Sequence, residues 1–206
     1  MKLLGTDGSP YVRKCRIAFE EKGIAYDYVT ASPSNPASGV AAANPLSKIP
    51  TLVLDNGKGL YDSCVIVDYI DGLKGNPTLI PPNFPDRIEV RRWEALGNGL
   101  MDATVNIFHN RRLPADKQAG PEADAKQFKK INAGLAAMQN DLGARDFCFG
   151  NSLTLADIVC GVALGYMDRV LPDFDWRANY PGLKRHAARL AERPSFRKTL
   201  PVPVPA

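Results

Sequence analysis

The rest of the chain is organised around one stretch, Pro45-Leu46-Ser47-Lys48-Ile49-Pro50-Thr51-Leu52-Val53-Leu54. Pro50 precedes a β-branched, apolar run, and because proline cannot donate a hydrogen bond to a sheet, it belongs at the first residue of a strand. With a cis Ile49–Pro50 peptide, the N–H and C=O groups of Ile49 would turn outward and pair with a peptide-like ligand. The alternative is a trans proline before an ordinary strand, since only about 5–6% of X–Pro bonds are cis. The motifs on either side favour the cis form.

The composition is that of an ordinary folded chain. Its 206 residues, 45% of them hydrophobic and 23% charged, suffice for one large core or two smaller ones, which excludes global disorder. The formal net charge of +4 is modest and scattered. Arg87, Arg91 and Arg92 cluster without interleaved aromatic residues, so a solvated helix face explains them better than a nucleic-acid site does.

Cysteine and histidine usage argues against a metal centre. The cysteines have no C-x-x-C spacing, and only two histidines could complete a ligand set. Free cysteines at apolar helix positions are most often small core residues. The first residues contain no apolar signal core, and no run approaches the ~18 apolar residues of a membrane helix. We therefore expect a cytoplasmic protein with no metal and no membrane contact. These cysteines and histidines are Cys15, Cys64, Cys148, Cys160, His109 and His186.

The first 80 residues predict an α/β unit. Ser9 as N-cap and Pro10 at the first helical position begin a helix that Gly23 ends. Asp62-Ser63 begins a second helix, after a hairpin with a type I′ turn signal at residues 55–59. The order is βαβ followed by ββα. The expected strands are residues 2–4, 25–29, 51–54 and 60–61, with a helical turn inside residues 37–43.

The sequence of the second half of the chain predicts only helices. Four prolines between Pro77 and Asp86 indicate a stiff linker. We expect an N-terminal domain at residues 1–78, a linker at 79–86 and an all-helical domain at 87–206. The expected helices cover residues 87–112, 121–143, 155–170, 182–191 and a short segment after Pro194.

One helix start is unusually specific. In Leu153-Thr154-Leu155-Ala156-Asp157-Ile158, Thr154 caps the helix and Asp157 reaches back to the N–H group of the cap residue, while Leu153 packs against Ile158. This pattern favours a folding role for Asp157 over a role as a catalytic acid or base.

Taken together, these motifs resemble the cytosolic-type glutathione transferases, and the resemblance covers nearly the whole chain. The first motif looks most like that of a bacterial, serine-type subgroup. No cysteine stands at the position of the beta-class catalytic cysteine, near Ser9-Pro10. The resemblance implies a thioredoxin-like N-terminal domain and an all-α C-terminal domain. The matching segments are residues 9–14, 44–50, Asp62-Ser63, 154–157 and Arg193-Pro194-Ser195-Phe196.

The resemblance also implies a glutathione site. The Ile49 backbone beside a cis Pro50 would pair with the cysteinyl backbone of glutathione, and Lys48 with its glycyl carboxylate. Asp62 and Ser63 would hold the γ-glutamyl end, because a helix N-terminus suits a carboxylate and the aspartate charge suits an ammonium. The alternative for Asp62-Ser63 is a plain N-cap pair, and the two roles are compatible.

Ser9 is the candidate catalytic residue. A hydroxyl that donates a hydrogen bond to sulfur at a helix N-terminus favours the thiolate, so Ser9 would stabilise the nucleophile and not attack. The alternative is an N-cap serine with no further role. Tyr11 is a competing donor, although its position just inside the helix also fits the core or a pocket wall.

The helical domain should supply the electrophile pocket. Asn98 or Asp102 would reach the γ-glutamyl group bound by the partner in a dimer, as residues on this helix do in some related classes. Apolar residues at helical spacing are more often core than pocket. The pocket candidates are Met101, Val105, Phe108, His109 and Tyr166.

The resulting hypothesis is a homodimeric transferase that joins the glutathione thiolate to a small apolar electrophile, as in detoxification. Two alternatives remain open. One is glutathione-dependent reduction of disulfides or peroxides, and the other is a non-catalytic interaction protein with the same fold.

Overall fold

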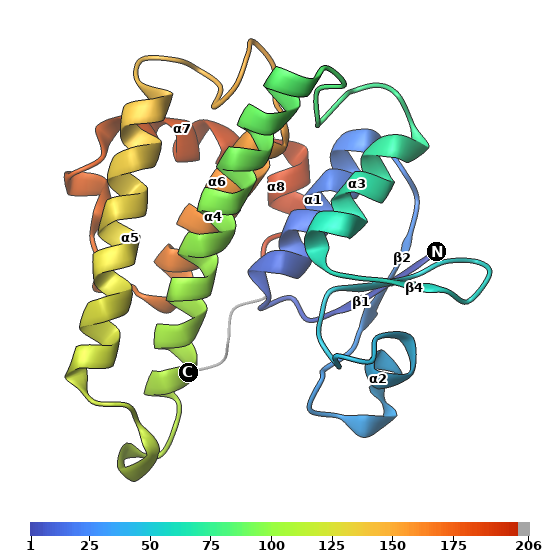
Figure 1. The fold of residues 1–206 in the computed structure, drawn as a ribbon, viewed down its shortest axis with the longest axis horizontal. Coiled ribbons are helices and arrows are strands. Elements are labelled where there is room, and N and C mark those ends of the chain that lie inside the picture. Colours follow the sequence, from blue (N-terminus) through green and yellow to red (C-terminus); the bar gives the residue numbers. More distant parts are fainter. Residues whose placement is uncertain (202–206) are drawn as a thin grey trace. The chain divides into compact units, whose positions relative to one another are not determined.

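Four strands form one sheet in the first half of the chain (Figure 1). The computed structural model describes residues 1–201. The strands lie in the order β2-β1-β3-β4; β1 and β2 are parallel, whereas β3 is antiparallel to both β1 and β4. The bounds are Lys2–Gly5 (β1), Asp27–Thr30 (β2), Thr51–Val53 (β3) and Gly59–Leu60 (β4).

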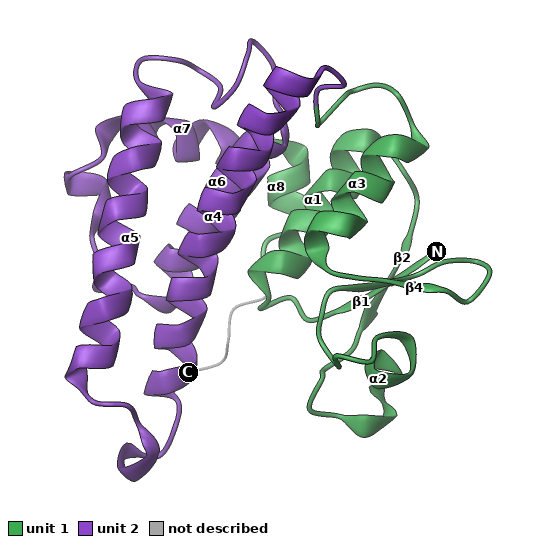
Figure 2. Cartoon of the chain, viewed as in Figure 1, with its two compact units in different colours: residues 1–80, 192–206 green, residues 81–191 purple. Residues whose placement is uncertain are grey.

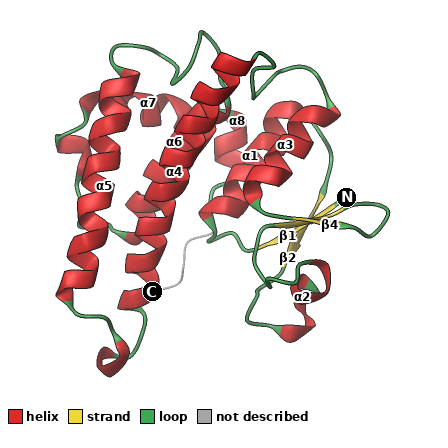
Figure 3. Ribbon diagram, viewed as in Figure 1, coloured by secondary structure: helices red, strands yellow, loops and turns green. Residues whose placement is uncertain are grey.

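Helices cover both faces of this sheet (Figure 3). The helices α1 (Pro10–Lys22) and α3 (Ser63–Leu73) pack together on one face, and α2 (Val40–Ala43) lies on the other. Because side chains alternate along a strand, Leu3 faces α1 and α3, whereas Leu4 packs in a cluster with Val40. The 3₁₀ turn η1, Pro36–Ser38, precedes α2.

Gly5 allows α1 to approach the end of β1. A Cβ atom at this position would lie 2.5 Å from the Cγ2 atom of Val12, well inside van der Waals contact. The turn from strand to helix therefore requires glycine for space and not for a special backbone conformation.

The last described segment belongs with the sheet. The chain divides into two compact units: residues 1–80 together with the segment from Glu192 onward, and residues 81–191 (Figure 2). The helix α8 (Pro194–Lys198) contacts α1, and the guanidinium of Arg193 donates two hydrogen bonds of 2.9 and 2.7 Å to the Glu21 carboxylate. We expected this segment in the helical domain, but the half-buried carboxylate on α1 binds it to the first unit.

The second unit consists of helices. The helix α4 packs against α5 and α6, and α7 packs against both α5 and α6. The contact between α4 and α6 is close at Gly97, where a Cβ atom would lie 2.6 Å from a methyl group of Val159. The bounds are Phe84–Arg111 (α4), Ala115–Lys117 (η2), Pro121–Leu142 (α5), Leu155–Val170 (α6), Trp176–Ala178 (η3) and Pro181–Ala191 (α7).

Two boundaries differ from those expected, each for a local reason. The helix α4 begins at Phe84, inside the predicted linker, because Asn83 caps it and proline is tolerated in the first turn. The strand β2 begins at Asp27 because its ladder starts at Lys2 of β1, leaving residues 25–26 without a partner strand. The capping box of Thr154 and Asp157 is present as predicted.

Burial shifts the titration of two side chains in the core of this second unit. It raises the pKa of the Cys148 thiol well above its usual value, and the neighbouring Cys160 and Asp157 act in the same direction. Burial likewise lowers the pKa of His186, against the opposing effect of Asp157.

Within residues 1–201, every helix is too short or too polar to cross a bilayer.

Candidate functional site

The sheet register brings three sequence motifs to one end of the first unit. Leu4 pairs with Thr51, and Leu52 pairs with Leu60. Because both ladders are antiparallel, continuing them places Pro50 beside Gly5 on one side and beside Asp62 on the other. The turn after β1, the loop before β3 and the start of α3 therefore meet at the same end of the sheet. Ser9, Ile49 and Ser63 belong to these three segments.

Ser9 is the N-cap of α1. Its Oγ accepts a hydrogen bond of 3.4 Å from the backbone N–H of Val12, and its own N–H donates to the carbonyl of Thr6. The side chain is half-buried. Among residues 1–201, no acceptor takes the proton of its hydroxyl, so capping leaves the hydroxyl able to donate to a ligand. The competing donor, Tyr11, lies half-buried in the first turn of the same helix.

Asn44 organises the loop before β3. Its side-chain amide donates to the Lys48 carbonyl at 3.0 Å and to Thr51 Oγ1 at 3.2 Å, and its Oδ1 accepts the N–H of Leu46. The Lys48 carbonyl also accepts a 2.8 Å hydrogen bond from the Thr51 hydroxyl. Asn44 is buried, whereas the Lys48 side chain is exposed. Sequence analysis gave Asn44 no role, although an asparagine before Pro45 is a typical turn signal.

The backbone at Ile49 is available for pairing. The Ile49–Pro50 peptide is cis, the form that the flanking motifs favoured. Within residues 1–201, no protein group forms a hydrogen bond with the backbone N–H or C=O of Ile49. Pro50 is buried and Ile49 is partly exposed, so the residue lies at the surface of the unit.

Asp62 and Ser63 form the start of α3. Asp62 is the exposed N-cap, and its Oδ1 accepts the N–H of Cys64 at 2.9 Å. Ser63 follows at the first helical position and is buried, and its carbonyl accepts a long hydrogen bond of 3.8 Å from the Cys15 thiol. The capping alternative is thus present in the structure, and the second carboxylate oxygen of Asp62 extends the negative charge toward solvent.

The charges at this end of the unit suit a zwitterionic ligand. Two helix N-termini, those of α1 and α3, present backbone N–H groups that favour an anion. The carboxylate of Asp62 favours a cation, and the exposed ammonium of Lys48 favours a second anion. A peptide with free carboxylates and one ammonium group matches this arrangement.

The residues expected to contact the electrophile and the partner's ligand belong to the second unit. Phe108 on α4 lies edge-on to Tyr166 of α6, with ring centroids 6.5 Å apart, and 5.5 Å from the ring of His109. Burial raises the pKa of Tyr166 to about 12, with Arg169 opposing it, so its hydroxyl stays protonated at neutral pH. The other predicted residues share α4. Val105 and Asn98 are half-buried, Asp102 and His109 are exposed, and Met101 is fully buried.

Models of known families match both halves of the chain. Residues 3–78 match the glutathione S-transferase N-terminal domain, and residues 108–189 match the glutathione S-transferase C-terminal domain. An uncharacterized GST-like protein of Escherichia coli, YibF, is 35% identical over 203 residues, which cover 98% of each chain.

Solved structures agree with these matches. A glutathione S-transferase of Methylobacillus flagellatus with bound glutathione superposes with a TM-score of 0.94 and 43% identity, covering 98% of this chain and 99% of that one. A glutathione S-transferase of Methylobacterium radiotolerans in complex with glutathione sulfonate gives a TM-score of 0.92 and 38% identity, covering 100% and 96%.

Proposed function

The chain belongs to the glutathione S-transferase family of enzymes, and from this premise we propose that it activates the thiol of glutathione for addition to, or substitution on, a small apolar electrophile. The observation that carries the proposal is the meeting of Ser9, Ile49 and Asp62-Ser63 at one end of the sheet. Each of these segments offers a group that a different part of glutathione requires.

Glutathione would be held along its whole length. The Asp62 carboxylate pairs with the γ-glutamyl ammonium, while Ser63 and the N–H groups at the start of α3 receive the γ-glutamyl carboxylate. The N–H and C=O of Ile49 pair with the cysteinyl residue as a short added strand would, and Pro50 holds this segment at the start of the central strand β3. Lys48 receives the glycyl carboxylate.

Ser9 would lower the pKa of the bound thiol. Its Oγ uses one lone pair to cap α1, so its proton remains for a hydrogen bond to sulfur, which stabilises the thiolate more than the thiol. The N-terminus of α1 acts in the same direction. The thiol proton leaves to solvent, and the thiolate forms a C–S bond with the electrophile. In a substitution the leaving group departs with the electron pair of its broken bond, and in an addition or epoxide opening the resulting carbanion or alkoxide takes a proton from solvent.

The second unit would contact the electrophile and form part of a homodimer. The electrophile contacts Phe108, His109 and Tyr166, with Val105 and Met101 behind them. Asn98 or Asp102, one helical turn apart on α4, contacts glutathione bound by the partner. Four of the large apolar side chains that are exposed in the single chain are candidates for the dimer surface. They are Leu46 and Val65 in the first unit, and Phe84 and Ile88 in the second.

Two measurements on the unmodified protein test the proposal. The first is calorimetric binding of glutathione, together with an ultraviolet titration of its thiolate, which we expect to ionise at lower pH when bound than when free. The second is a panel of aryl halides, enones, epoxides, disulfides and hydroperoxides, in which we expect turnover with the first three classes. We place this activity in the cytoplasm.

Two results would contradict the proposal. The absence of glutathione binding would favour a non-catalytic interaction protein. Turnover confined to disulfides and hydroperoxides would favour a reductase.

A further inference from the structure

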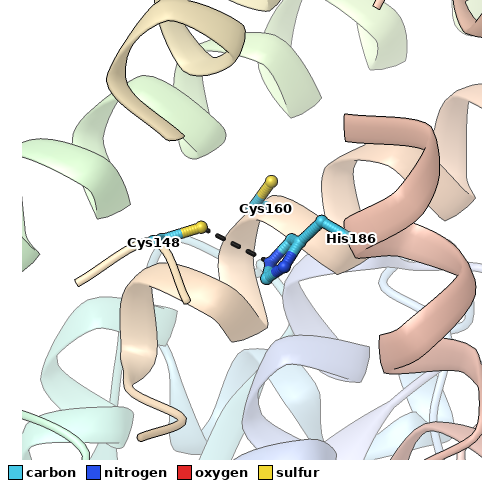
Figure 4. A group of neighbouring side chains, drawn as sticks. All are labelled: Cys148, Cys160 and His186. Carbon is cyan, nitrogen blue, oxygen red and sulfur yellow. Dashed lines mark hydrogen bonds between the residues drawn. The ribbon is translucent and has the colours of Figure 1, made fainter. Parts of the chain in front are cut away.

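Three buried side chains with metal-ligating atoms converge inside the second unit (Figure 4). Cys148 lies in the segment between α5 and α6, Cys160 lies on α6, and His186 lies on α7. Their ligand atoms all lie within 4.8 Å of one another, and the three residues are at most 2% exposed. The proposed glutathione chemistry uses none of them.

The hydrogen bonds of His186 leave one ring nitrogen with a lone pair. Nδ1 lies 3.1 Å from the backbone carbonyl of Asp146, which can only accept, so we assign the proton of a neutral ring to Nδ1. Arg189 Nη2 lies 3.4 Å from the same nitrogen, at the limit of hydrogen-bond distance. Nε2 therefore carries the lone pair, and it lies 3.4 Å from the Cys148 sulfur. Metal-ligating histidines commonly have this arrangement, with the second nitrogen donating to a carbonyl or carboxylate.

Asp157 lies beside this group. Its Oδ1 lies 3.4 Å from Nε2 of His186 and accepts the N–H of Cys148 at 2.8 Å. A carboxylate oxygen has a second lone pair, so this hydrogen bond does not prevent coordination.

Two of the distances among these atoms fit a tetrahedral zinc site. With bonds of about 2.3 Å to sulfur and about 2.0–2.1 Å to nitrogen and oxygen, tetrahedral ligands lie about 3.5–3.6 Å apart for S and N, and about 3.3–3.4 Å apart for N and O. The corresponding distances here are both 3.4 Å. Sulfur, imidazole and carboxylate are all ordinary zinc ligands.

We propose that Cys148, Cys160 and His186, with Asp157 as fourth ligand, form a structural site for Zn²⁺ or a similarly thiophilic divalent ion. On binding, both thiols lose their protons to solvent, and the two thiolates donate to the metal without any change of oxidation state. The site joins α6, α7 and the segment before α6 inside one unit. It is independent of the proposed transferase activity.

Cobalt substitution tests the proposal on the whole protein. Reduced, metal-free protein is titrated with Co²⁺, whose thiolate complexes absorb in the near ultraviolet and whose tetrahedral complexes absorb strongly in the visible, and Zn²⁺ is then added to displace it. The test variant is Cys160→Ala. The matched control is Cys64→Ala, which removes the most exposed cysteine and leaves the site intact.

We expect wild type and Cys64→Ala each to bind one equivalent of Co²⁺. Both complexes should show the thiolate bands in the near ultraviolet and the tetrahedral bands in the visible. Zn²⁺ should then displace the Co²⁺ from both proteins. Because Cys148 remains, Cys160→Ala should show weaker thiolate bands, and it should bind Zn²⁺ at least about tenfold more weakly, which is the smallest loss typical even of groups that only orient a ligand. Zn²⁺ should also raise the Tm of wild type more than that of Cys160→Ala.

The wild-type spectrum keeps the proposal open to refutation even if Cys160→Ala does not fold. Absence of thiolate bands in the wild type would overturn it. So would full bands in folded Cys160→Ala, or a Cys148–Cys160 disulfide in protein purified without reductant.

Discussion

The helices α3 and α6 each have at their start an aspartate that accepts hydrogen bonds from backbone N–H groups. The two aspartates nevertheless have different roles. At α3, Asp62 is exposed and commits one oxygen to the helix through its hydrogen bond from Cys64. At α6, Asp157 is fully buried; its Oδ1 accepts from the Cys148 N–H, and its Oδ2 accepts from both the N–H and the hydroxyl of Thr154.

The comparison shows that burial, and not residue type, decides whether a capping carboxylate can reach a ligand that arrives from solvent. An exposed cap keeps a free oxygen and a charge that a ligand can use. A buried cap must satisfy both oxygens within the protein, because an unpaired buried charge is strongly unfavourable. Substitutions at the two helix starts should therefore affect different properties.

The largest effect is expected for Asp157→Ala. It leaves the Cys148 and Thr154 amides without an acceptor in the core, so the free energy of unfolding should fall by roughly 3 kcal/mol or more. Urea denaturation measures this loss. The control is Asp86→Ala in the more exposed cap of α4, which should cost about 0.5–1 kcal/mol. Equal losses in the two variants would break the comparison.

The second-largest effect is expected for Ser9→Ala, and it should appear in the catalytic activity. Without the hydroxyl, the pKa of bound glutathione should rise by about one to two units, and turnover at neutral pH should fall about 10–100-fold. Stability should fall by only about 1 kcal/mol, since one cap is lost. Ser9→Thr keeps the hydroxyl and should retain most of the activity. If the thiolate titrates at the same pH in wild type and Ser9→Ala, Ser9 is only a cap and Tyr11 becomes the candidate donor.

Asp62→Asn sharpens the comparison because it removes the charge while keeping an oxygen to cap α3. We expect the glutathione Kd to rise about tenfold, corresponding to one charge-assisted hydrogen bond, with a smaller change in kcat. Asp68→Asn, the same charge change elsewhere on α3, should leave the Kd near that of wild type. Isothermal titration and steady-state kinetics separate the two effects, and an unchanged Kd in Asp62→Asn would remove Asp62 from the site.

The Glu21 carboxylate is intermediate in exposure between those of Asp62 and Asp157. Its substitution should have the smallest effect. Burial alone would raise its pKa, but hydrogen bonds from Arg193 and Ser195 outweigh burial and hold the pKa below its usual value. Because the unfolded state binds this proton more readily, the stabilisation is complete above the ordinary carboxyl pKa and is lost as pH falls through the folded-state value.

Glu21→Gln should therefore be about 1 kcal/mol less stable than wild type at neutral pH. The difference should shrink as the pH is lowered from about 6 to about 3. Denaturation of both proteins across this range measures it, and a difference that does not depend on pH would contradict the assignment.

Much of the fold could be predicted because local signals agree with the tertiary structure. Ser9-Pro10 and Gly23 bound α1, and the capping box begins α6 at Leu155, both as predicted. The expected architecture, a thioredoxin-like domain followed by an all-α domain, is confirmed by the family and structural matches. Two boundaries were misplaced. The start of β2 depends on where its partner strand β1 begins, and the start of α4 depends on the Asn83 cap within a proline-rich segment.

Less of the candidate glutathione site could be predicted from the sequence. Its motifs were visible one by one, but their meeting at one end of the sheet follows from the register of β3 with both β1 and β4. Asn44 was named only as part of a matching segment, because its role consists of hydrogen bonds to Lys48 and Thr51 that no spacing rule describes.

The sequence by itself determined the starts of α1, α3 and α6, the presence of the β3–β4 hairpin and the order of elements, because these depend on groups a few residues apart. Only the tertiary structure decided which distant groups share an environment. Spacing argued against a metal centre, yet folding brings Cys148, Cys160 and His186 within 4.8 Å in a buried cluster. In the same way, it joined Arg193 to Glu21 across 172 positions of the chain. Contacts of this kind arise because burial requires each polar group to find a partner, wherever in the chain that partner lies.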